Sequence, residues 1–81
     1  MQLLFYQFDD SALIYNVTTG DTHALSSLDA LILEKLIMPD IHENAVIAAI
    51  TNFFETYEEA SEYFFTIKKL LLQLHLLEKG I

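Results

Sequence analysis

The chain has 81 residues, of which 53% are hydrophobic, and a formal net charge of −8 at pH 7. This length predicts a single domain over residues 1–81 with a thin core, and the hydrophobic fraction excludes a disordered chain. Twelve acidic residues against four lysines disfavour nucleic-acid binding and favour a basic peptide or a basic enzyme surface as the partner. The absence of cysteine excludes disulfides and thiolate chemistry.

The apolar segments are too short to predict a membrane span. The densest run, Leu70 to Leu77, is interrupted by Gln73 and His75. The N-terminal stretch lacks the positively charged region and the small-residue cleavage site of a secretory signal. We therefore expect a cytoplasmic protein that does not bind membranes.

The N-terminal third of the chain predicts a three-stranded antiparallel sheet. Leu3 to Phe8 is apolar and aromatic, and Asp9 to Ser11 forms the turn that follows it. Two more β-prone runs, Ala12 to Val17 and Asp21 to Leu25, flank Gly20, which can take the positive φ of a tight hairpin. The third strand is expected at an edge of the sheet, and it carries no proline or lysine that would block further pairing.

Three helices are expected after the sheet. Ser26 and Asp29 stand in capping spacing, which predicts a helix from about Ser27, over residues 28–37, that ends before Pro39. Its expected apolar stripe comprises Leu28, Leu31, Ile32 and Leu36.

The second and third helices are predicted from two further capping patterns. Asp40 and Glu43 predict a helix over residues 41–54. Thr56 and Glu59 predict a long helix that reaches Lys79 and stops at Gly80. The second helix has an expected core stripe of Ile41, Ala45, Val46, Ala49, Ile50 and Phe53.

The last helix has apolar residues on two sides. Its wide apolar face comprises Ala60, Tyr63, Phe64, Ile67, Leu70, Leu71, Leu74 and Leu77. At 100° per residue, Phe65, Leu72 and Leu76 fall on the opposite side, beside Lys68 and Lys69. This second side is either a peptide groove, a dimer face or a surface packed under the N-terminal strand, and the sequence does not decide among them.

The hairpin segment carries a family resemblance. The run TGDTHAL resembles the SGxTHxL hairpin of PqqD-like proteins of the HPr-rel-A system branch. It keeps Gly20, Thr22, His23 and Leu25, with Thr19 in place of the usual serine. The resemblance implies a RiPP recognition element, an α+β, winged-helix-like domain with an N-terminal three-stranded sheet followed by three helices. Such a domain binds the leader of a ribosomally made precursor peptide and presents it to a peptide-modifying enzyme.

The expected mechanism is β-strand addition to the third strand. It requires no catalysis and no cofactor, so we expect an adaptor and not an enzyme. The candidate peptide-binding residues are Asp21, Thr22, His23, Ala24 and Leu25 on the strand, with Phe65, Lys68 and Leu72 on the last helix.

Other site chemistries are weaker interpretations of the sequence. His23, His42 and His75 are too scattered for a local metal motif, and the acidic residues from Glu55 to Glu62 most simply match the start of a helix. Ser27 with the following Leu-Asp is similar to the phosphopantetheine attachment site of acyl carrier proteins, although strands are expected where that fold has a helix. A structural homodimer subunit is the third alternative.

Overall fold

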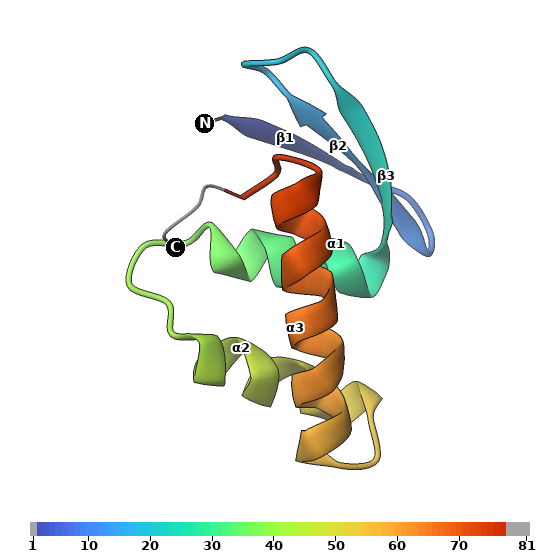
Figure 1. The fold of residues 1–81 in the computed structure, drawn as a ribbon. Helices are drawn as coiled ribbons and strands as arrows, with labels where there is room; N and C mark the ends of the chain where they lie inside the picture. The colour runs from blue at the N-terminus through green and yellow to red at the C-terminus, as the bar shows by residue number, and fades with distance from the viewer. Residues whose placement is uncertain (1, 78–81) are drawn as a thin grey trace. The chain divides into compact units, whose positions relative to one another are not determined.

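The computed structural model describes residues 2–77, and the chain divides into two compact units, Met1–Leu31 and Ile32–Ile81. Three antiparallel strands precede three α-helices, which confirms the expected α+β arrangement (Figure 1). The elements are β1 Leu3–Gln7, β2 Ser11–Asn16, β3 Thr22–Ser26, α1 Ser27–Leu36, α2 Glu43–Ile50, the 3-10 helix η1 Thr51–Phe53 and α3 Tyr57–Gln73. Helix α1 begins in the first unit and ends in the second.

The sheet has the strand order β1-β2-β3. Leu3 is paired with Asn16 across β1 and β2, and Ala12 is paired with Leu25 across β2 and β3. Burial alternates along β2, where Ala12, Ile14 and Asn16 are buried. Because side chains alternate between the two faces of a strand, this pattern assigns one buried face and one more open face to the sheet.

Asn16 organises the turn between β2 and β3. Its side-chain Oδ1 accepts hydrogen bonds from the backbone N–H groups of Thr18 (2.9 Å) and Thr19 (3.3 Å). Gly20 donates its N–H to the backbone carbonyl of Asn16 (2.8 Å) and has a φ of +81°. The predicted glycine turn is therefore confirmed, and a buried asparagine holds it in place.

Helix α1 begins as the sequence predicts. The Ser26 hydroxyl accepts the backbone N–H of Asp29 at 3.2 Å, which satisfies one free donor of the first turn. The helix ends at Leu36, shortly before Pro39. In the second unit, α1 contributes the buried residues Ile32, Leu33 and Leu36 to the core.

The predicted start of the second helix at Ile41 is wrong. Asp40 has a φ of +64°, in the left-handed region, so its backbone does not have the extended geometry of an N-cap. The N-cap is His42, with an extended backbone and no capping side chain, and α2 runs from Glu43. The stripe is also shifted, because Phe53 is exposed and Ile47 is buried.

Helix α3 begins at a confirmed cap. The Thr56 hydroxyl accepts the backbone N–H of Glu59 (3.1 Å) and donates to its carboxylate (3.3 Å). One face is buried at Ala60, Phe64, Ile67 and Leu71, and α2 and η1 lie beside this helix (Figure 1). Within residues 2–77, no helix combines the length and the apolar run that a bilayer crossing needs.

The end of α3 differs from the prediction. The helix stops at Gln73, and His75 takes a φ of +60°. Leu76 donates its N–H to the carbonyl of Leu71 (2.9 Å) and His75 to that of Leu72 (3.1 Å), which together form a Schellman motif. Leu76 is consequently fully buried and does not extend a second exposed face of the helix. The predicted stop at Lys79 and Gly80 lies outside the described residues.

Candidate functional site

Strand β3 has one edge that no strand of the described sheet covers. The backbone N–H of Asn16 donates to the carbonyl of Asp21 at 2.8 Å, which fixes the phase of hydrogen bonding between β2 and β3. Because inward and outward backbone groups alternate along a strand, His23 and Leu25 bond to β2. Thr22 and Ala24 therefore direct their N–H and C=O groups away from β2, toward the open edge.

The side chains of β3 alternate in burial as well. Thr22 and Ala24 are exposed, His23 is half-buried and Leu25 is buried. Thr22 and Ala24 thus combine outward backbone groups with exposed small side chains, and neither blocks the approach of another extended chain. His23 and Leu25 instead belong to the hairpin and to the buried face of the sheet.

Two further positions refine the predicted strand. Asp21 is exposed and precedes β3, and its carbonyl is already used by Asn16. Ser26 is the last residue of the strand, and its backbone N–H and C=O groups point away from β2, as those of Thr22 and Ala24 do. The spacing of Ser26 and Asp29 predicts only a helix cap, although strict alternation from Thr22 also places the backbone groups of Ser26 at the open edge.

The three predicted helix positions have different environments. The spacing of Phe65 and Leu72 places them on one side of α3, where Phe65 is 51% exposed and Leu72 is half-buried. Lys68 forms an ion pair with Glu43 of α2, which sequence reasoning missed because the two residues are 25 positions apart. Lys68 therefore connects α2 to α3, and β3 belongs to the other unit.

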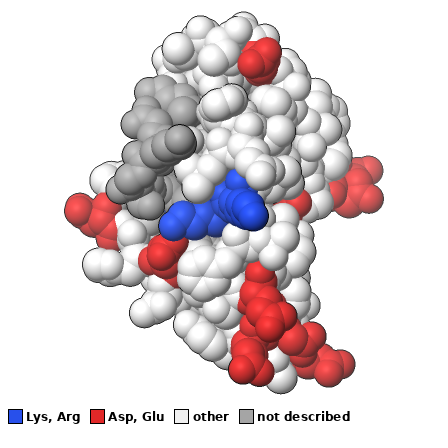
Figure 2. All heavy atoms as spheres, in the orientation of Figure 1, with Lys and Arg blue, Asp and Glu red and all other residues white. Residues whose placement is uncertain are grey.

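The charges of the second unit are unevenly distributed. Figure 2 shows lysines gathered in one patch with acidic atoms against it, and a larger group of acidic side chains toward the start of α3. The sequence around the start of α3 contains four glutamates, Glu55, Glu58, Glu59 and Glu62. Across residues 2–77, no group of three or more His, Cys, Asp or Glu side chains is arranged to hold a metal ion.

Ser27 has a structural partner. The Gln7 side-chain Nε2 donates to the Ser27 hydroxyl at 2.9 Å and also to the carbonyls of Phe8 and Ser11. This amide joins the start of α1 to the turn between β1 and β2. The residues before Ser27 form strands, so the surroundings of this serine do not favour the acyl-carrier alternative.

Comparison with protein-family models, with curated proteins and with solved structures gives no match. The resemblance to PqqD-like proteins therefore rests on the hairpin segment from Thr19 to Leu25 and stays a prediction. The features of the chain that bear on its function are the open edge of β3 and the net negative charge.

Proposed function

We propose that this chain is a non-catalytic peptide-binding adaptor of the PqqD-like kind. It binds the leader of a ribosomally made precursor peptide by β-strand addition to β3 and presents it to a modifying enzyme, in the cytoplasm and without a cofactor. The observation that carries the proposal is the open edge at Thr22 and Ala24, where backbone donors and acceptors point outward beside exposed side chains.

Strand addition suits this edge for a physical reason. An extended peptide that pairs with Thr22 and Ala24 gains main-chain hydrogen bonds without disturbing those that join β3 to β2. The sequence of β3 contains none of the devices that commonly protect an edge, such as proline, lysine or a bulge. Backbone pairing fixes the register of the peptide, and its alternate side chains determine specificity.

The charge of the chain favours a basic partner. With a formal net charge of −8, the protein attracts cationic segments and repels nucleic acids. The proposed occupant of the β3 edge is therefore an extended peptide segment that carries lysine or arginine. Asp21, exposed at the start of β3, is the nearest acidic residue in the sequence to this edge.

Proline substitution at Ala24 tests this proposal. Ala24→Pro removes an outward N–H that β2 does not use, so the hairpin keeps its internal hydrogen bonds while the edge loses a donor. We expect the variant to remain folded and its affinity for the leader to fall at least about tenfold, since each lost hydrogen bond near 1.4 kcal/mol is a factor of ten. Binding is measured by amide NMR titration with overlapping peptides encoded beside the gene.

Two variants serve as controls for this experiment. Ala24→Val changes the side chain but keeps the N–H, and it should retain binding. His23→Pro removes an N–H that bonds to β2, so it should lower the unfolding temperature where Ala24→Pro does not. Wild-type affinity in a folded Ala24→Pro variant would rule out strand addition at this edge.

A further inference from the structure

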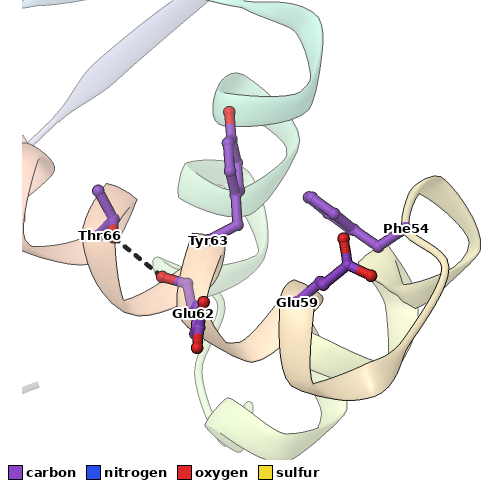
Figure 3. A pocket seen from close by; sticks show the side chains of 5 residues that line it. All are labelled: Phe54, Glu59, Glu62, Tyr63 and Thr66. Carbon is purple, nitrogen blue, oxygen red and sulfur yellow. Dashed lines mark hydrogen bonds between the residues drawn. The ribbon is translucent and has the colours of Figure 1, made fainter.

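A hollow lies along the first half of α3. It has a volume of about 330 Å³ and is lined by Phe54, Glu59, Glu62, Tyr63 and Thr66. Figure 3 shows four of these residues on α3, and Phe54 reaching toward the helix from the segment after η1. The volume is near the lower end of the range for ligand sites, about 300–1,000 Å³, which suits a single side chain better than a large ligand.

The walls of the hollow combine aromatic rings and carboxylates. Phe54 and Tyr63 form a tilted pair with ring centroids 5.2 Å apart and an interplanar angle of 46°. Glu59 and Glu62 are exposed, and neither has a cationic partner among residues 2–77. An aromatic face attracts a cation through its quadrupole, and a carboxylate adds a direct charge interaction.

The hydrogen bonds in the hollow leave acceptors available. The Thr66 hydroxyl donates to the backbone carbonyl of Glu62 at 3.0 Å. Glu59 accepts from the Thr56 hydroxyl through Oε1. Among the described residues, no hydrogen bond is made to the second carboxylate oxygen of Glu59 or to either carboxylate oxygen of Glu62, so these atoms remain for a donor that enters from solvent.

We infer that this hollow binds an arginine side chain of a basic peptide. A guanidinium group is planar, stacks on an aromatic ring and at the same time donates to carboxylates, whereas an ammonium group is a compact point charge. The hollow thus offers a guanidinium group sufficient room, contact with aromatic rings and opposite charge. It lies within the second unit, so this inference does not depend on strand addition at β3.

The test is an NMR titration of the whole chain with N-acetyl-arginine methylamide. Its citrulline counterpart has nearly the same shape but no charge, and it is the matched control. We expect saturable shifts at Phe54, Glu59, Tyr63 and Thr66 with the arginine probe and none with the citrulline probe. The expected dissociation constant is on the order of 1–10 mM, because the site is open to solvent.

Two substitutions that each remove one negative charge distinguish binding in the hollow from attraction by the overall acidic charge of the chain. Glu62→Gln removes a lining carboxylate and should weaken the arginine probe about two- to fivefold. Glu58→Gln removes a charge from the same helix outside the hollow, and the affinity should stay within error of wild type. The inference is overturned if both substitutions weaken binding equally, if the citrulline probe binds as well, or if the shifts never saturate.

A failure of this test is distinguishable from a failure of strand addition. The arginine probe should shift the NMR signals of residues 54–66, whereas leader binding should shift those of β3. Shifts confined to β3 with the arginine probe would also overturn the inference, because they would place the cationic site in the other unit.

Discussion

Within residues 2–77, two residues other than glycine have a left-handed backbone conformation, Asp40 (φ +64°) and His75 (φ +60°). A side chain with a Cβ is disfavoured there because Cβ approaches the following carbonyl oxygen. His75 occupies this conformation at the C′ position of the motif that ends α3, where glycine is the usual residue. The chain therefore tolerates local strain in order to bury Leu76.

Replacing His75 with glycine should stabilise the protein. The left-handed conformation costs a Cβ-bearing residue about 1–2 kcal/mol, which glycine avoids. Glycine also gives the unfolded chain more conformational entropy, and this offsets about 0.4–1 kcal/mol of the gain. We expect His75→Gly to raise the free energy of unfolding by about 0.5–1 kcal/mol, measured by urea denaturation. His75→Ala is the matched control: it removes the imidazole, keeps Cβ and should give no gain. An equal gain in both variants would contradict this explanation.

At the scale of the element, the signals that sequence analysis found are those that act over three or four residues. The Ser26 cap, the Thr56 cap and the Gly20 turn are all confirmed, because each depends on one side chain and the backbone beside it. Asp40 shows the limit of this reasoning. It has the residue type and spacing of a cap, but a cap also requires an extended backbone, which the residue types alone do not specify.

The end of α3 was mispredicted for a related reason. The apolar repeat continues beyond Gln73, so the sequence pattern alone favours a longer helix. No glycine marks the C′ position, because His75 occupies it. The left-handed turn brings Leu76 into the core instead of extending the helix, and burial of this side chain offsets the strain.

The alternation of side chains along β3, in contrast, follows from the predicted hairpin. The sequence alone could therefore predict that Thr22 and Ala24 lie on the opposite face of the strand from His23 and Leu25.

The ion pair between Lys68 and Glu43 connects two helices, and its strength can be measured directly. The two side chains are 22% and 42% exposed, so solvent screens their attraction. We expect a double-mutant cycle with Lys68→Met and Glu43→Gln to give a coupling energy below about 1 kcal/mol that decreases as salt is added.

Lys69 is the matched control for that cycle. It neighbours Lys68 in the sequence and is exposed. A cycle of Lys69→Met with Glu43→Gln should therefore give no coupling. If the two cycles agree, Lys68 does not hold α2 to α3, and its assignment to a peptide-binding surface gains support.

At the scale of the whole molecule, the two units differ in the kind of element that supplies most of their core residues. The first unit contributes strand residues such as Ile14 and Leu25, and the second contributes helix residues such as Val46 and Phe64. Apolar side chains that remain exposed in the first unit include Tyr6 and Phe8. These exposed side chains keep the structural homodimer as an alternative to a monomeric adaptor. Sedimentation at several protein concentrations distinguishes the two.

If the chain binds a basic leader peptide as proposed, its acidic charge should control the rate at which that peptide associates. Opposite charges steer two molecules together over distances comparable to the Debye length, about 10 Å at 0.1 M salt and about 3 Å at 1 M. Raising the salt concentration from about 0.05 to about 0.5 M should therefore slow association about tenfold. The dissociation rate should change much less, because the backbone hydrogen bonds proposed at the β3 edge carry no net charge.

Stopped-flow measurements on the wild-type chain check this expectation, with two forms of one leader peptide. In the control peptide every lysine and arginine is replaced by glutamine, so the length and the capacity for backbone pairing are kept. Its association rate should be slow at both salt concentrations, and its dissociation rate should match that of the basic form. If salt instead raises the dissociation rate of the basic peptide tenfold, ion pairs and not strand pairing hold the complex. The β3 edge would then lose its place as the main binding surface, and the aromatic and acidic hollow of α3 would take it.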